Sequence, residues 1–480
     1  MESPVPASPR LTRGDLPRPA PGIVHLGPGA FFRAFNAVYT DDALAVAPGA
    51  WGIVAVSLKS PTARDQLAPQ KGAFTAVTLT PEGADYRVVG SIVDVLVAPE
   101  DPEAVLAAMT APATRIVSLT VTEKGYAHEP ATGQLDVSHP DIAHDLTGGA
   151  PRSAVGFLVE ALARRRSAGT DPFTVLTCDN LPSNGAVLRG LVLAFAKARD
   201  GGLADWIERN VAFPSTMVDR ITPATTEADI AALAAAQGYE DPACVTHEPF
   251  RQWVIEDRFP TGRPAWDRAG AQFVRSVEAH EMMKLRCLNG THSTLAYLGY
   301  LAGYETIAET VADPAFAALC EKVWAEEIVP TLEPPEGEDL PAYCAALLER
   351  YRNPGIRHRT WQIAMDGSQK LPQRILGTLA DNLAAGRHSP GLILAVAGWM
   401  RYVGGVDEAG QAIDVRDPMA GRLKDLSDGA GGAETRARAL LSVAEIFPRD
   451  LAAALDGPVG EALARLTEDG SQATVKGLVA

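Results

Sequence analysis

Four side chains that could carry a proton transfer lie within one short stretch of the chain. They are Glu281, Lys284, Asn289 and His292, a carboxylate, a cation, an amide and an imidazole. On a helix that turns by about 100° per residue, they project within roughly 140° of one another, and three leucines share that flank. Because burial disfavours the charged form of a lysine, we expect the pKa of Lys284 to fall toward about 7 to 8, the range useful to a general base.

The same stretch also fits an ordinary amphipathic helix. In that case the amine of Lys284 reaches solvent along its aliphatic stem, and His292 is a hydrogen-bonded core residue. The spacing of the four residues leaves both interpretations open.

A glycine turn follows the first predicted strand, residues 23–26. The turn, Gly27-Pro-Gly29-Ala-Phe-Phe-Arg33, leads into an apolar run that predicts a helix. In dinucleotide-binding folds the first glycine permits the tight turn, the second lets backbone approach the pyrophosphate, and helix amides hold the phosphates. Phe32 stands where the third glycine of that pattern lies, so a plain strand-to-helix turn fits equally well.

Apolar strands alternate with helical stretches through the first half of the chain. We expect strands at residues 51–58, 115–122 and 173–178, a hairpin at 74–92, and a helix at 153–166. This alternation predicts an α/β fold, a Rossmann-like, doubly wound and mainly parallel sheet. Ligands of such sheets bind beyond the carboxyl ends of the strands.

Asn180 closes the last of these predicted strands. An Asp-Asn pair before a proline is ordinary turn and cap chemistry. The same position would also direct a neutral donor into the expected cleft, so both roles stay open.

The second half shows long helical periodicity with little strand signal. Helices are predicted at residues 280–301, 314–328, 339–352, 373–386, 390–402, 435–447 and 458–467. We therefore expect a loose, proline-rich N-terminal arm over 1–21, a Rossmann-like dinucleotide-binding domain over 22–279, and a mostly α-helical substrate and catalytic domain over 280–480.

Cations gather in this second half, although the net charge of the chain is −16. Arg357, His358 and Arg359 are followed by Lys370 and Arg374. A solvated helix end is one explanation. The other is a seat for a carboxylate, because the guanidinium fork suits bidentate binding of that group.

Composition narrows the class of protein. The acidic balance argues against nucleic acid or an anionic membrane as the main partner. The five cysteines show neither a C-x-x-C pair nor metal-ligand spacing, so we expect reduced thiols in a cytoplasm and no metal site. No signal-peptide core and no apolar run of about 18 residues is present, which predicts a soluble, unexported protein.

Several separated motifs together resemble the mannitol dehydrogenase family, the polyol-specific long-chain dehydrogenases/reductases. They are the glycine turn, Thr120-Val-Thr-Glu-Lys-Gly-Tyr126, Cys178-Asp-Asn-Leu-Pro-Ser-Asn-Gly185, Met217-Val-Asp-Arg-Ile221 and the spacing Lys284-x4-Asn289-x2-His292. The resemblance runs from about Gly22 to the end of the chain. Within the family, residues 248–256, 357–370 and 405–414 resemble most the members that reduce D-fructuronate to D-mannonate.

The resemblance implies an oxidoreductase that transfers a hydride between NAD(H) and a sugar acid, without a metal. It implies that Lys284 is the catalytic acid/base, and that Asn180 and Asn289 bind the reacting oxygen as it gains negative charge. His292 would orient the substrate, and Glu281 would gate proton exchange with solvent.

Further site residues follow from the motifs and the basic cluster. The candidate cofactor-binding residues are Gly27, Gly29, Ala30, Phe31, Arg33, Asp65 and Glu123, and the candidate substrate-binding residues are Asp219, Arg359, Lys370 and Arg374. No acid directly follows the second strand. Asp65 would favour NAD, whereas Lys59 or Arg64 could accept the 2′-phosphate of NADP, so the prediction of NAD depends on the resemblance.

Two other functions compete with this one. The same chemistry on an uncharged hexitol, D-mannitol or D-fructose, would not need the basic cluster. A catalytically silent nucleotide-binding sensor of redox state would not need the Lys284 group, although it could retain it by descent. The sequence leaves the oligomeric state and the turnover open.

Overall fold

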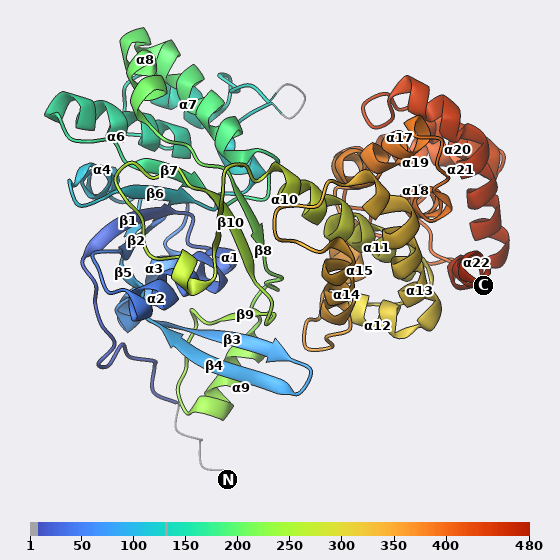
Figure 1. Cartoon of the computed structure of the whole chain (residues 1–480), viewed down its shortest axis with the longest axis horizontal. Helices are drawn as coiled ribbons and strands as arrows, with labels where there is room; N and C mark the ends of the chain where they lie inside the picture. The colour runs from blue at the N-terminus through green and yellow to red at the C-terminus, as the bar shows by residue number, and fades with distance from the viewer. Residues whose placement is uncertain (1–7, 130–132) are drawn as a thin grey trace. The chain divides into compact units, whose positions relative to one another are not determined.

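The computed structural model describes residues 8–129 and 133–480, and the chain divides into two compact units. Unit 1 is Met1–Glu278 and unit 2 is Ala279–Ala480 (Figure 1). Unit 1 is built on sheets, and the described residues of unit 2 are mostly helical.

The main sheet of unit 1 has five strands. In spatial order they are β5 (Ile92–Val97), β2 (Gly52–Ser57), β1 (Pro21–Leu26), β6 (Ile116–Leu119) and β7 (Thr174–Thr177), and every neighbouring pair is parallel. The strand order reverses between β1 and β6, which is the switch point where ligands of open α/β sheets bind. The predicted fold class, a doubly wound parallel sheet followed by a helical domain, is confirmed.

Both faces of this sheet are buried. On one face Val24 and Val117 pack against a helical layer of α4 (Pro102–Thr110), α6 (Ala154–Ala168) and α7 (Asn184–Arg199). The other face belongs to a second core, which contains Ile23 and Ile53 together with residues of the following helix, α2 (Asn36–Val46). Burial on both sides explains why these strands read as continuous apolar runs.

Two smaller sheets complete the strands of unit 1. The hairpin of β3 (Phe74–Thr80) and β4 (Gly83–Val89) pairs with β9 (Val245–His247), and β8 (Thr216–Asp219) pairs with β10 (Gln252–Glu256), which pairs with β11 (Gln272–Val274). The predicted hairpin is present, but its second strand stops at Val89 instead of Ile92. The hairpin ends before Gly90 and Ser91, and the next residues form β5, an edge strand of the main sheet that the sequence pattern did not distinguish from the hairpin.

Residues 8–20 depart from the predicted loose arm; the first seven residues lie outside the described part of the structure. This segment has almost no regular structure, as its prolines predict, yet Arg13 is buried. Its guanidinium donates to the backbone oxygens of Lys71 (2.8 Å), Ile92 (2.9 Å) and Gly90. Hydrogen bonds from one charged side chain therefore anchor a segment that has no periodic pattern.

Unit 2 is organised around α11 (Thr291–Leu301), of which Tyr300 is the one residue that is not buried. The helices that pack on it include α12 (Ile307–Ala312), α15 (Thr360–Ala364), α18 (Pro390–Val403) and α22 (Ser471–Val479). Unit 2 also contains the helices α13 (Pro314–Lys322), α14 (Leu340–Tyr351), α16 (Gly367–Leu371), α17 (Gly377–Ala384), α19 (Ala420–Asp428), α20 (Ala433–Leu441) and α21 (Arg449–Asp469).

One predicted helix of unit 2 is longer than expected. The sequence places its start at Pro458, because proline favours the first turn of a helix. The structure has Pro458 inside α21, between the buried residues Leu455 and Val459. Burial of the flanking side chains offsets the hydrogen bond that the proline cannot donate.

The predicted helix over 280–301 is continuous but not uniform. It runs as α10 (Glu278–Met283), a π-helix over Lys284–Gly290, and α11. Two more predicted helices also contain π segments, Val323–Ile328 and Pro372–Leu376. A π-helix bonds residue i to i+5 and is wider than an α-helix, so the angles expected at 100° per residue do not hold through these segments.

Candidate functional site

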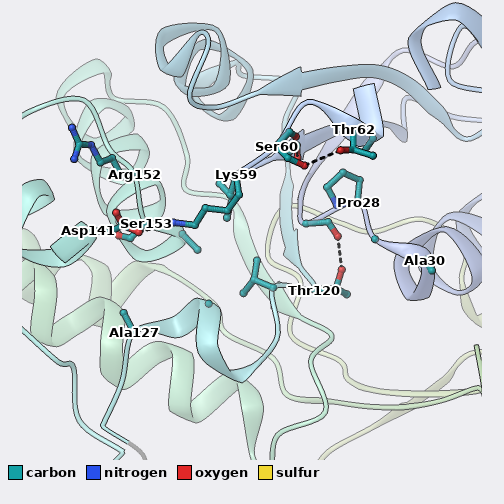
Figure 2. A pocket seen from close by; sticks show the side chains of 18 of the residues that line it. Pro28, Ala30, Lys59, Ser60, Thr62, Thr120, Ala127, Asp141, Arg152 and Ser153 are labelled. Carbon is teal, nitrogen blue, oxygen red and sulfur yellow. Dashed lines mark hydrogen bonds and ion pairs between the residues drawn. The ribbon is translucent and has the colours of Figure 1, made fainter. Parts of the chain in front are cut away.

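A pocket of about 520 Å³ lies in unit 1 at the carboxyl ends of β1, β2 and β6 (Figure 2). Most of its lining follows directly after these three strands. The lining residues are Gly27, Pro28, Gly29, Ala30, Arg33, Ser57, Leu58, Lys59, Ser60, Thr62, Ala63, Gln66, Thr120, Val121, Gly125, Ala127, His139, Asp141, Arg152, Ser153 and Ala154. This volume lies within the range of small-molecule and cofactor sites, roughly 300 to 1,000 Å³.

The glycine turn forms the floor of this pocket. Gly27 has φ +93°, and a Cβ there would lie 2.3 Å from the backbone oxygen of Thr120, so only glycine fits. A Cβ on Gly29 would meet nothing within 4 Å, because this residue faces open space. The first glycine therefore lets two strands end side by side, and the second leaves room for a ligand to approach the backbone.

Two side chains near the turn take over the packing role that a third glycine would have. Phe32 is fully buried and stacks on the ring of His25, with ring centroids 3.6 Å apart. Arg33 is buried as well, and its Nη1 donates to the backbone oxygen of Pro28 at 2.7 Å. The close packing that a third glycine would permit is replaced here by an aromatic stack, and Arg33 holds the turn itself.

The structure brings some of the predicted cofactor-binding residues to the pocket and leaves others away from it. Gly27, Gly29, Ala30 and Arg33 line it, whereas Phe31 stacks on Phe35 and does not. Asp65 does not line the pocket either.

Asp65 lies on α3 (Thr62–Leu67), and its carboxylate is 2.8 Å from the guanidinium of Arg64. Glu123 begins the 3-10 helix Glu123–Tyr126, and its side chain lies outside the described part of the structure.

A carboxylate that sequence reasoning missed ties two strand ends together. Asp179 accepts hydrogen bonds from the backbone nitrogens of Val121 (3.0 Å) and Thr122 (2.8 Å) and from the hydroxyl of Tyr126 (2.6 Å). Burial raises the pKa of Asp179, an effect that these donors partly offset. The carboxylate therefore fixes the backbone after β6, on one wall of the pocket. Its neighbour Asn180 is exposed.

Together these features fit a dinucleotide. The pocket lies at the switch point of a parallel sheet, the second glycine is open toward the ligand, and hydroxyl and amide donors line the walls. Asp219, a predicted substrate contact, is the buried last residue of β8 and does not line this pocket.

The second candidate site lies in unit 2, on the π-helix Lys284–Gly290. Lys284 and Asn289 are five residues apart, the hydrogen-bond spacing of such a helix, so both project from nearly the same side. Both side chains are buried, as is His292 on the first turn of α11. Glu281, on α10, is partly exposed. The wider turn thus brings together the residues that an α-helix would spread over a broad flank.

Side-chain donors compensate for the irregular backbone. The indole of Trp324 donates to the backbone oxygen of Cys287 at 2.9 Å, and the hydroxyl of Tyr351 donates to that of Leu288 at 3.0 Å. A carbonyl without a partner in a buried helix would cost roughly 1 to 3 kcal/mol. These two aromatic residues therefore stabilise the π-helix from neighbouring elements.

His292 is held as a neutral imidazole. Its ring stacks on Tyr351 at 4.6 Å and meets the edge of His358 at 5.0 Å. Burial lowers the pKa of His292 well below its ordinary value, and the positive charge of Arg374 lowers it further. Its Nε2 has no hydrogen-bond partner among the described residues. A buried nitrogen in this state is suited to a ligand that completes the bond.

Part of the predicted basic cluster converges on this histidine. Arg374 donates from Nη1 to the hydroxyl of Ser293 at 3.1 Å. Lys370 is partly buried, and burial together with Arg374 lowers its pKa to about 8. Burial and these two cations also lower the pKa of His358 to about 4.

Arg359 lies apart from this group. Its side chain is 56% exposed, and its Nε is 3.6 Å from the carboxylate of Glu305. The structure therefore divides the predicted cluster into a partly buried pair, Lys370 and Arg374, and a surface arginine.

The described residues contain no group of three or more histidine, cysteine or acidic side chains that could hold a metal ion. Within residues 8–129 and 133–480, no helix is long and apolar enough to cross a membrane.

The chain matches known protein families along most of its length. Residues 21–268 match the model of the mannitol dehydrogenase Rossmann domain, and residues 276–466 match the model of the mannitol dehydrogenase C-terminal domain.

Individual relatives are similar over nearly the whole chain. D-mannonate oxidoreductase of Escherichia coli (strain K12) is 50% identical over 95% of each chain. Mannitol 2-dehydrogenase of Cereibacter sphaeroides is 41% identical over 98% of this chain and 99% of its own length. Among solved structures, mannitol 2-dehydrogenase of Pseudomonas fluorescens in a ternary complex with NAD and D-mannitol superposes with a TM-score of 0.86, at 38% identity over 99% of this chain and 97% of that one.

Proposed function

The chain belongs to the mannitol dehydrogenase family of NAD-dependent oxidoreductases, which act on the CH–OH group of polyols or sugar acids, and we propose that its substrates are the sugar acids D-fructuronate and D-mannonate. The single observation that carries this choice is a pair of partly buried cations, Arg374 near His292 and Lys370 near His358. The relative named D-mannonate oxidoreductase, at 50% identity, supports it.

The positive charge of Arg374 disfavours the charged form of Lys370. Each is buried enough for its pKa to fall, and Arg374 is among the causes of the shift of Lys370. A bound carboxylate would offset both effects, because a hydrogen bond from a charged donor contributes about 1.5 to 3 kcal/mol. An uncharged hexitol would leave the repulsion in place. The pair therefore favours a substrate with a carboxylate.

The catalytic roles in unit 2 follow from burial and spacing. NAD bound to unit 1 supplies the acceptor of the hydride. Lys284 takes the proton of the substrate hydroxyl during oxidation and returns it during reduction. The side chain of Lys284 is buried, and burial disfavours the charged form of an amine.

Asn289 lies one π-turn from this amine and donates its amide N–H to the substrate oxygen as negative charge develops there. His292, neutral and with an open Nε2, orients the substrate through a hydrogen bond. Glu281 exchanges the proton with solvent, to which it is partly exposed. In unit 1, Asn180 is assigned the same role as Asn289.

A second candidate is the interconversion of D-mannitol and D-fructose. Several relatives between 41% and 44% identical are named mannitol 2-dehydrogenase, and one such enzyme has been solved with D-mannitol. The two candidates differ by one carboxylate on the substrate.

The test is a comparison of four substrates. The purified chain is mixed with NADH and D-fructuronate or D-fructose, and with NAD and D-mannonate or D-mannitol, and the absorbance of NADH is followed. We expect kcat/KM to favour the sugar acids by about tenfold or more, as one or two charged hydrogen bonds would give. Equal values for acid and hexitol would favour the second candidate, and no reaction with either pair would contradict both.

A further inference from the structure

An ion pair lies in the cofactor pocket at the point where a dinucleotide fold usually presents an acid. The residue after the second strand of such a fold commonly contacts the adenosine ribose, and an acid there selects NAD. Here the chain continues from β2 into Leu58 and Lys59, without an acid. The ammonium of Lys59 instead lies 2.6 Å from a carboxylate oxygen of Asp141.

Asp141 comes from a distant part of unit 1. It lies in the first turn of α5 (Pro140–Leu146), 82 residues after Lys59. Figure 2 shows the two side chains meeting inside the pocket, with Ser153 and Arg152 close to Asp141. Of the described residues that line the pocket, Asp141 is the one with a carboxylate.

The two partners differ in how firmly they are held. The side chain of Lys59 is 74% exposed, whereas that of Asp141 is 22% exposed. The hydrogen bond from Lys59 lowers the pKa of Asp141, and the positive charges of Lys59 and Arg152 act in the same direction. The carboxylate is therefore ionised and confined, and the lysine is the mobile partner.

The other acids of this region are engaged elsewhere. Asp65 and Glu100 both pair with Arg64, and neither lines the pocket. This pairing also neutralises Arg64, a cation that could have accepted a 2′-phosphate.

We propose that Asp141 is the residue that selects NAD over NADP. Its carboxylate accepts a hydrogen bond from the ribose 2′-hydroxyl, which replaces or shares the bond from Lys59. A 2′-phosphate at the same place would meet the negative charge of Asp141, and Lys59 is already paired. The acid that the fold usually places after the second strand is thus supplied here by α5.

The size of the effect follows from the repulsion between like charges. Two charges about 4 Å apart in a partly solvated site interact by an amount that corresponds to roughly tenfold to a thousandfold in affinity. The Lys59–Asp141 pair itself contributes little to stability, since exposed pairs of this kind rarely do. Substitutions of Asp141 are therefore expected to leave the fold intact.

The experiment measures binding without a substrate, so its result does not depend on the proposed sugar acid. The affinities of ADP-ribose and of 2′-phospho-ADP-ribose are measured by calorimetry for the whole chain, and kcat/KM with NADH and NADPH is measured alongside. We expect Asp141→Asn to narrow the preference for the unphosphorylated ligand by about tenfold or more, mainly through tighter binding of the phosphorylated one. Adding Lys59→Met to that variant should remove the gain, because the freed ammonium is then gone.

Two further variants make the proposal sharper. Lys59→Glu adds negative charge beside Asp141 and should widen the preference. Asp65→Asn is the matched control, a nearby carboxylate that does not line the pocket, and it should leave the preference unchanged because Arg64 keeps its ion pair with Glu100. The proposal is overturned if Asp141→Asn leaves the ratio of the two affinities unchanged, if Lys59→Glu does not widen it, or if Asp65→Asn is the variant that shifts it.

Discussion

The two units build their candidate sites from different parts of the chain. In unit 1 the backbone makes the site, because a glycine turn ends one strand and leaves the next helix open to a ligand. In unit 2 side chains make it, and a change of helix type brings them together. A site made by backbone depends on a few glycines, whereas a site made by side chains depends on every element that fixes their helix.

The largest effect should come from the side-chain site. Lys284→Ala removes the proposed acid/base, so kcat should fall by about 10²- to 10⁴-fold, while NADH affinity, a property of unit 1, should stay within about twofold of wild type. Steady-state kinetics and NADH fluorescence titration measure the two quantities. Lys322→Ala, which removes a partly exposed lysine paired with Glu326, is the control. A parallel loss of NADH affinity would show that Lys284 has a different role.

The next effect concerns the oxygen-binding amides. Asn289→Ala should lower kcat by about 10²- to 10³-fold with a smaller change in KM, because its donor stabilises charge that develops only in the transition state. Asn180→Ala should do the same from unit 1. Asn210→Ala, at an exposed helix end, serves as the control. A variant that changes KM alone would identify its residue as a substrate-positioning group.

Substrate choice should depend on the partly buried cations Lys370 and Arg374 and not on the surface residue Arg359. Lys370→Met or Arg374→Met should reduce the preference of kcat/KM for D-mannonate over D-mannitol by about tenfold or more, the value of one charged hydrogen bond. Arg359→Met should leave the preference unchanged, since its side chain is exposed and near Glu305. If Arg359→Met has the largest effect of the three, the carboxylate binds at the surface of the cluster.

The π-helix can be tested through a glycine. A Cβ on Gly290 would lie 2.8 Å from the backbone oxygen of Arg374, so Gly290→Ala should destabilise unit 2 by roughly 1 to 3 kcal/mol and lower kcat. Gly457→Ala, in α21 with nothing within 4 Å of the new Cβ, should not destabilise it. Thermal unfolding followed by circular dichroism compares the two. An unchanged Tm for Gly290→Ala would mean that the π-helices can separate at little cost.

The smallest effect is a pH dependence of substrate binding. The pKa of Lys370 is about 8, so its positive charge is present below that pH and is lost as pH rises through it. The KM for D-mannonate should therefore rise above about pH 8, by at most about tenfold per unit, while the KM for D-mannitol should not follow. Lys370→Met should abolish the difference. Identical profiles for the two substrates would exclude Lys370 as the carboxylate ligand.

The comparison also separates what the sequence could and could not predict. The strand, glycine turn and helix of the pocket were predictable, because each is a local pattern with a fixed physical cause. The ion pair of Lys59 with Asp141 was not, because it joins residues 82 positions apart and no pattern links them.

The prediction of one helix over 280–301 was right in extent, and it was wrong in type only over the π-helix Lys284–Gly290. No residue marks a π-turn, since its stability depends on donors such as Trp324 and Tyr351, which come from other helices. The same reasoning applies to the basic cluster. Its composition suggested a carboxylate seat, but the division between Lys370 and Arg359 depends on tertiary packing.

The π-helix Lys284–Gly290 holds about one residue more than an α-helix with the same total turn, because each of its turns is wider. Loss of one residue would therefore let the segment close into an α-helix while the face of α11 that packs on α18 keeps nearly its orientation. Gain of one residue would instead rotate α11 by roughly 100° and carry His292 away from Lys284. Engineered chimeras of this enzyme can therefore shorten this segment by one residue, but not lengthen it.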